Sequence, residues 1–171
     1  MNIGPYTVEE YKNLVKSFHG YIAPGLMVGG FMVDHALNHL PEGDFFDAVC
    51  ETRACLPDAV QLLTPCTIGN GWLKILDLGR YALTLYEKFG GKGVRVYLDV
   101  RKLDSWPNIK NWFLKLTPKD QQDSNALMEE IAEAHITILG MAAVEVRSDH
   151  LDKKHKDIIT VCPACGEAYR A

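Results

Sequence analysis

The sequence predicts an α+β fold, in which helices pack on an antiparallel sheet and a small cysteine-bearing appendage follows at the C-terminus. Three observations predict it. Apolar residues recur at helical spacing towards both ends of the first 148 residues, two-residue alternation occupies the middle, and a cysteine pair follows a polar linker. The predicted order is helix, helix, strand, helix, strand, strand, helix, strand, which favours an antiparallel sheet. We expect a core domain over residues 1–148 and a linker with a metal-binding tail over 149–171.

The first two helices are predicted from their starts and from apolar spacing. Thr7 and Glu10 form a capping box, in which each side chain satisfies a backbone N–H of the first turn. Apolar residues at helical spacing follow to about residue 20. A second helix is expected over residues 24–40. Gly29-Gly30 inside it lowers helix propensity, so we expect another element to approach it closely there.

The other elements are predicted from alternation and turn residues. Gly90-Gly91 separates two alternating runs and predicts a hairpin. A long helix opening at Thr117-Pro118 is expected to bury a stripe that runs from Leu127 to Leu139. Strands are expected over 49–54, 81–85, 94–98, 142–147 and 158–161, and shorter helices over 57–63 and 106–114.

Composition argues against several classes of protein. The chain of 171 residues has a net charge of −4 and no long basic run, which disfavours nucleic-acid binding. Its apolar stretches stop well short of the roughly 20 residues that a membrane helix needs, and its first residues show no secretory signal. The five cysteines, an odd number, argue against a disulfide framework. We therefore expect a cytoplasmic protein without membrane contact, whose thiols serve metal or redox chemistry.

Cys162 and Cys165 form the most specific motif in the chain. Two thiolates in a Cys-x-x-Cys turn can bind one zinc ion, and Gly166 lets the backbone fold around it. A structural zinc site has four ligands, so the pair is half of a site. The missing ligands are expected from His150 and His155, from core cysteines, or from the same pair of a second copy in a homodimer. A redox role for the pair is the alternative, but redox pairs usually open a helix.

Further motifs lie between residues 18 and 82. Phe-His-Gly-Tyr-Ile-Ala-Pro-Gly-Leu at 18–26 is similar to a motif F-H-G-H-x-C-P-G-L. The blocks at 51–61, 64–71 and 77–82 are similar to E-T-x-x-C-x-x-D-A-I-Q, to T-G-C-T-x-G-K-G-N-L and to D-x-G-K-x-A. Together these motifs resemble the family of the E subunit of molybdenum/tungsten formylmethanofuran dehydrogenase over about residues 10–100. The chain departs from the family pattern at Tyr21, Ala23, Pro65, Asn70 and Trp72.

The resemblance implies an α+β core, often an intertwined dimer, and in some members a C-terminal zinc finger. It implies a core cleft with metal-ligand chemistry, for which this chain retains His19, Cys55 and Cys66. The residues themselves add physical expectations. Asp58 is expected to orient His19. Loop N–H groups beside Cys66 and a helix N-terminus beside Cys55 are expected to lower the thiol pKa values.

Two functions follow from these patterns. The first is a non-catalytic, zinc-binding auxiliary protein, expected to be a homodimer in keeping with the resemblance, with zinc at Cys162 and Cys165 and a core cleft formed by His19, Cys55 and Cys66. Its tail would serve structure, metal sensing or a protein partner. The second is a metal- or thiol-dependent enzyme of anaerobic one-carbon metabolism related to methanogenesis, which would use His19 and Cys66. An enzyme site keeps an open metal position for water or substrate, whereas a structural site is closed by four protein ligands.

Overall fold

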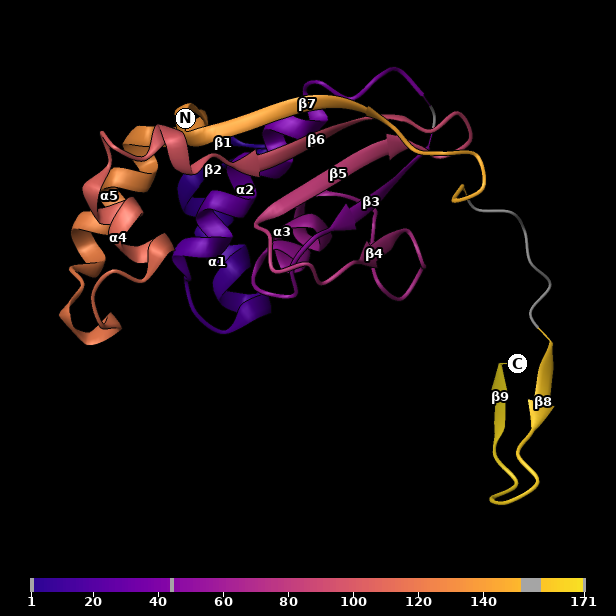
Figure 1. Ribbon diagram of the computed structural model, residues 1–171. Coiled ribbons are helices and arrows are strands. Elements are labelled where there is room, and N and C mark those ends of the chain that lie inside the picture. The colour runs from indigo at the N-terminus through magenta and orange to yellow at the C-terminus, as the bar shows by residue number, and fades with distance from the viewer. Residues whose placement is uncertain (1, 44, 152–157, 171) are drawn as a thin grey trace.

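The protein is an α+β molecule built on a five-stranded sheet (Figure 1). The computed structural model describes residues 2–43, 45–151 and 158–170. The strands are β1 Asn2–Ile3, β2 Tyr6–Thr7, β3 Phe46–Cys50, β4 Leu73–Ile75, β5 Ala82–Glu87, β6 Lys92–Leu98, β7 Leu139–Glu145, β8 Ile159–Val161 and β9 Ala168–Arg170. The α-helices are α1 Val8–His19, α2 Pro24–Leu37, α3 Leu56–Leu63, α4 Pro107–Leu114 and α5 Ser124–Ala134. Short 3-10 turns occupy Val100–Lys102 (η1), Lys119–Gln121 (η2) and His135–Ile138 (η3).

The central sheet has the strand order β4-β3-β5-β6-β7. The pairs β3–β5, β5–β6 and β6–β7 are antiparallel, as the sequence predicts. The pair β3–β4 is parallel, and β4 was not predicted because three residues are too few to show alternation. The strand expected at 49–54 lies instead at Phe46–Cys50, and Cys50 is fully buried in the core.

Helix α2 is the centre of the core. It contacts α3, β5 and β6, and its residues are buried around most of its circumference. A methyl group on Gly30 would lie 2.7 Å from a ring carbon of Tyr11, and one on Gly29 would lie 3.0 Å from the Cβ of Ala59. The close approach expected at these two glycines is therefore present. The capping box of α1 is also present.

The long helix expected from residue 117 to 139 is divided in the structure. Helix α5 ends at Ala134, because His135 adopts a positive φ of 48° that an α-helix cannot continue. A 3-10 turn follows, and Leu139 opens β7. The apolar spacing that predicted one helix therefore belongs to three successive elements that bury side chains in the same core. Figure 1 shows α4 and α5 beside one another at the end of the core where β7 begins.

Strands β8 and β9 form a separate antiparallel hairpin around the cysteine pair, with Thr160 opposite Tyr169. The strand expected at 158–161 is present, whereas β9 was not predicted. The hairpin's side chains are exposed or half-exposed. Within the part of the chain that the structure describes, no helix has the length and apolarity needed to cross a bilayer.

Candidate functional site

The cysteine pair lies on the tight turn that joins β8 to β9. The Cys162 N–H donates to the Glu167 carbonyl (2.8 Å), and the Gly166 N–H donates to the Cys162 carbonyl (2.9 Å). Gly166 has a φ of 77°, a conformation that favours glycine. These two hydrogen bonds fold the turn back on itself, so both cysteines come from one short loop.

Backbone dipoles around Cys162 favour its thiolate. The N–H groups of Cys165 and Ala164 hydrogen-bond to the Cys162 sulfur and lower its pKa, and the Cys165 side chain lowers the pKa further. Both thiols are free, and Cys165 is exposed. A thiolate is the form of cysteine that binds zinc, the metal that the sequence predicts at this turn.

The structure narrows the set of further ligands that could complete a site at this turn. Cys50 and Cys66 are fully buried in the core, so they cannot reach an exposed turn without unfolding. His150 is exposed, with its Nε2 3.9 Å from a carboxylate oxygen of Asp149. His155, the other histidine expected to contribute, lies outside the described residues.

In the core, His19 is held by Asp58. The Nδ1 atom of His19, at the end of α1, lies 2.7 Å from the Oδ2 atom of Asp58 in the first turn of α3. The predicted contact between Asp58 and His19 is therefore present. The centroid of the Tyr21 ring lies 5.0 Å from the centroid of the His19 ring. Tyr21 is one of the residues at which the chain departs from the family pattern.

Cys55 caps α3 in a strained conformation. Its φ is 53°, unusual for a residue with a side chain, and its side chain gives the helix no capping hydrogen bond. Burial raises the pKa of the Cys55 thiol, and the nearby Asp58 carboxylate raises it further. The pKa therefore shifts upwards, against the expectation that the helix N-terminus would lower it. The desolvation of a half-buried sulfur outweighs the helix dipole here.

A cavity of about 350 Å³ opens beside Cys55. Its wall includes Gly25 at the start of α2, whose carbonyl accepts a hydrogen bond from the Tyr81 hydroxyl. Residues 21–24 also line the cavity. The opposite part of the wall comes from α4, η2, α5 and the segment between η2 and α5, and includes Trp112, Lys119, Gln122 and Met128. The sequence analysis did not identify Lys119 or Gln122 as residues of this wall. No motif links them to Cys55, because more than fifty positions separate them in the chain.

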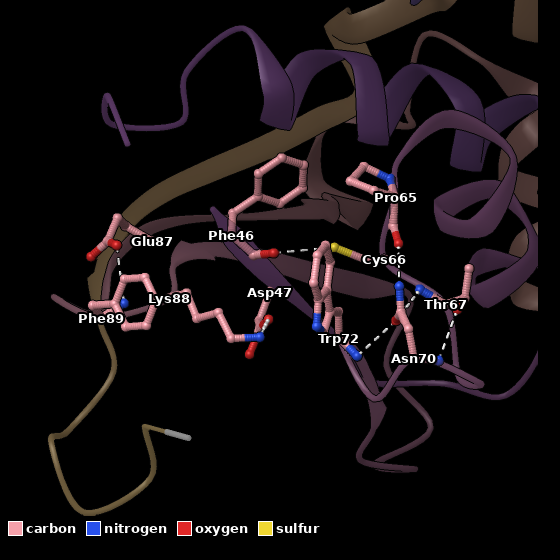
Figure 2. A network of polar contacts seen from close by, with 10 residues as sticks. All are labelled: Phe46, Asp47, Pro65, Cys66, Thr67, Asn70, Trp72, Glu87, Lys88 and Phe89. Carbon is pink, nitrogen blue, oxygen red and sulfur yellow. Dashed lines mark hydrogen bonds and ion pairs between the residues drawn. The ribbon is translucent and has the colours of Figure 1, made fainter. Parts of the chain in front are cut away.

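Cys66 lies in a different environment. Its sulfur donates to the Phe46 carbonyl (3.4 Å), beside the ion pair between Lys88 and Asp47 (Figure 2). The Lys88 ammonium also lies over the Trp72 ring, 4.7 Å from its centroid. Burial raises the pKa of the Cys66 thiol to about 11. The thiol is therefore protonated at neutral pH, contrary to the expected activation.

The glycine-containing loop after Cys66 is organised by Asn70 (Figure 2). The Asn70 side-chain oxygen accepts from the N–H groups of Thr67 and Trp72, and its amide nitrogen donates to the Pro65 carbonyl. These backbone donors are satisfied within the loop, so they are not directed at the Cys66 sulfur. Asn70 stands where the family pattern has lysine.

The predicted core trio is not brought together. Asp58 contacts His19, and the same carboxylate is close enough to Cys55 to influence its thiol, whereas Cys66 contacts Phe46. Within residues 2–43, 45–151 and 158–170, no three His, Cys, Asp or Glu side chains form a group that could hold a metal ion.

One conspicuous residue of the family-like blocks has a structural role. Glu51 forms a two-pronged ion pair with Arg95, at 2.5 Å and 2.8 Å. Hydrogen bonding to Arg95 lowers the pKa of the Glu51 carboxyl. The Glu51 carbonyl also accepts from the N–H groups of Leu78 and Arg80, which ties the 76–80 loop to the sheet.

Comparison with known proteins identifies relatives of this chain. It is 37% identical over 108 residues to a protein of Archaeoglobus fulgidus described as a probable S-adenosyl-L-methionine-binding protein. The match covers 58% of this chain and 28% of that protein, so the chain spans less than a third of this relative's length.

A crystal structure resembles nearly the whole chain. It is that of a protein from Syntrophus aciditrophicus described as similar to FmdE, the E subunit of tungsten formylmethanofuran dehydrogenase, and it is 55% identical to this chain. The TM-score is 0.90, and the superposition covers 99% of this chain and 89% of that one. Residues 18–160 also match the model of the family described as FmdE, molybdenum formylmethanofuran dehydrogenase operon. The resemblance recognised in the motifs is therefore confirmed, and the chain belongs to the FmdE family.

Proposed function

We propose that this protein is a non-catalytic auxiliary member of its family that binds zinc through Cys162 and Cys165 and acts as a homodimer. The observation that carries the proposal is the β8–β9 turn. Its two free thiols come from one loop, and backbone N–H groups lower the pKa of Cys162. A low thiol pKa reduces the proton competition that a metal ion must overcome.

The remaining ligands would come from the chain's own linker region or from a second copy. His150 is exposed and close in sequence to the turn, and His155 is the other linker candidate. The cysteine pair of a second copy would complete a four-thiolate site instead. The buried positions of Cys50 and Cys66 speak against a contribution from those two cysteines.

The contacts around the core cysteines support the auxiliary role over the catalytic alternative. An enzyme that used His19 with Cys66 would need both side chains at one reacting centre. His19 instead contacts Asp58, and Cys66 is a buried, protonated thiol against Phe46. The cavity beside Cys55 gives the core a place to bind a small molecule. The S-adenosyl-L-methionine binding described for the Archaeoglobus protein makes that compound the first ligand to try there.

The decisive experiment measures zinc per chain by elemental analysis and solution mass by light scattering. We expect wild-type protein purified with zinc to hold about one ion per chain if His150 or His155 completes the site. A four-thiolate site shared between two copies would give about half that amount. The variant Cys162→Ser/Cys165→Ser should lose the ion in either case.

Cys66→Ala is the matched control, because it removes a thiol without touching the hairpin. It should keep the full zinc content of the wild type. Zinc that persists in Cys162→Ser/Cys165→Ser and disappears from Cys66→Ala would contradict the proposal and place the metal in the core.

A further inference from the structure

The face of the central sheet that is turned away from the core carries a cavity of its own. Side chains alternate across a sheet, so Val49, Thr84 and Arg95, which lie opposite one another on β3, β5 and β6, share one face. Their neighbours Cys50 and Leu83 point to the other face and are fully buried in the core. We call the cavity on the first of these faces the outer groove, because Val49 and Thr84 line it.

Three segments of the chain enclose the outer groove. Val49 of β3 and Tyr86 of β5 belong to its floor, the loop at 76–80 forms one wall, and residues 145–150, at the end of β7 and beyond it, form the other. Its volume of about 560 Å³ is typical of a site for a small molecule. The groove shares no residue with the cavity beside Cys55.

Backbone hydrogen bonds fix the wall at 76–80. The Leu76 N–H donates to the Cys50 carbonyl (2.9 Å), and the N–H groups of Leu78 and Arg80 donate to the Glu51 carbonyl (3.0 Å and 3.1 Å). The loop nevertheless leaves the side chains of Leu76 and Leu78 56% and 60% exposed. Two leucines held side by side at the rim of a cavity form an apolar surface that gains free energy when a ligand covers it.

Arg80 is the cation that this wall offers to a ligand. Both carboxylate oxygens of Glu51 accept hydrogen bonds from Arg95, at 2.5 Å and 2.8 Å. The Arg80 guanidinium lies 3.9 Å from one of these oxygens, which is too far for a hydrogen bond, and its side chain is 68% exposed. Within the described residues it makes no shorter contact with a carboxylate, so its N–H donors are available to an anion.

The other charges at the groove balance one another. Arg147 forms a two-pronged ion pair with Asp149, at 3.1 Å and 2.7 Å. Lys74 and Glu145 both line the groove and contribute one charge of each sign. Among the described residues, Arg80 therefore leaves the groove with an excess of positive charge.

We propose that the outer groove binds an aliphatic carboxylate, with the hydrocarbon chain against Leu76, Leu78 and the floor and the carboxylate on Arg80. A guanidinium can donate two parallel N–H bonds to one carboxylate, which fixes the ligand's acidic end. The apolar surface beside it consists mainly of aliphatic side chains, which suit a flexible chain better than a stacked ring. The inference depends neither on the proposed zinc site nor on the cavity beside Cys55.

The first test compares ligands on the wild-type chain. Isothermal titration calorimetry at pH 7 with decanoate, below its micelle concentration, should show one saturable site per chain. In the series from butanoate to decanoate, affinity should rise about twofold per added methylene, which is less than the roughly fourfold of complete burial because the groove is open. Decyltrimethylammonium has the same chain with a cationic end and should bind at least about tenfold more weakly.

The second test removes the cation. Arg80→Gln keeps a long polar side chain without the charge and should weaken decanoate binding at least about tenfold. It should also abolish the preference for decanoate over decyltrimethylammonium. Arg101→Gln is the matched control, because Arg101 is also exposed but does not line the groove, and it should bind decanoate like the wild type.

The third test removes part of the apolar wall. Leu78→Ser should weaken decanoate binding about fivefold while changing butanoate binding little, because only the longer chain reaches the leucines. Leu116→Ser is the matched control, since Leu116 is 61% exposed and lies outside the groove. Circular dichroism verifies that each variant is folded, which exposed positions favour.

Each outcome either supports the groove or overturns it. Wild-type protein that shows no saturable decanoate binding, or that binds decyltrimethylammonium equally well, would overturn the proposal. Decanoate binding that is unchanged in Arg80→Gln and in Leu78→Ser would place the ligand elsewhere and overturn it too. Cys162→Ser/Cys165→Ser should bind decanoate like the wild type, so a failure of the zinc proposal and a failure of this one give different results.

Discussion

The cysteines show how surroundings set the chemistry of one residue type. Cys162 is half-exposed, and two backbone N–H groups lower its pKa. Cys50 and Cys66 are fully buried, and desolvation raises their pKa values to about 12 and about 11. At neutral pH the Cys162 thiol therefore has more thiolate character than the two buried thiols.

This contrast predicts the order in which the thiols react with iodoacetamide. In metal-free protein at pH 7, Cys162 should be alkylated first, because only the thiolate is nucleophilic and a lowered pKa increases its population. Cys66, with a pKa raised to about 11, should react at least about a hundredfold more slowly. Mass spectrometry of peptides after timed quenching measures both rates. Equal rates in folded protein would show that burial does not protect the core thiol.

Helix α2 is the element on which the core depends most. Its residues face α3, β5 and β6, and two glycines allow neighbours to approach its axis. At Gly30 the neighbour is the ring of Tyr11, whose hydroxyl donates to the Leu26 carbonyl and holds the ring in place. The ring cannot move away without breaking that hydrogen bond, so making room for a larger side chain at Gly30 costs free energy.

Gly30→Ala is therefore expected to destabilise the fold by about 1–3 kcal/mol, although alanine has the higher helix propensity. Gly69→Ala is the matched control, because a methyl group there would meet only the Thr67 hydroxyl, at 4.0 Å. That variant should change stability by less than about 0.5 kcal/mol. Urea unfolding followed by circular dichroism gives both values. A neutral Gly30→Ala would show that Tyr11 can move after all.

At the scale of the whole molecule, the β8–β9 hairpin stands apart from the core domain in its contacts. Its strands contact each other, and its side chains are exposed or half-exposed. A two-stranded hairpin of this length is marginal in water without further support. A bound metal at the turn would supply that support.

Deletion of residues 158–171 should therefore leave the core folded while abolishing zinc binding. We expect the thermal midpoint of the core to change by less than about 3 °C, because, among the residues that the structure describes, no buried core side chain comes from the hairpin. Differential scanning calorimetry of the full chain and the truncated chain, with zinc analysis of each, measures this. A fall of about 10 °C or more would show that the hairpin belongs to the folding unit of the core.

Local patterns predicted the elements whose determinants lie close together in the chain. The capping box at Thr7, the helix after Pro57 and the hairpin at Gly90-Gly91 are all present as expected. Strand β4 and the division after Ala134 were missed. The first is too short to show periodicity, and the second depends on a positive φ at His135 that no local pattern indicates.

The sequence alone was sufficient for the family, the α+β class, the pairing of Asp58 with His19 and the cysteine pair that the proposed zinc site uses. Each of these depends on residue types at short spacing or on motif order. Tertiary structure alone decided that Cys66 contacts Phe46 and not His19, that a cavity opens beside Cys55, and that β7 is an edge of the sheet. These features depend on contacts between segments that are distant in the chain. Burial then sets the pKa values of the core thiols, and a residue's neighbours in space cannot be inferred from its neighbours in sequence.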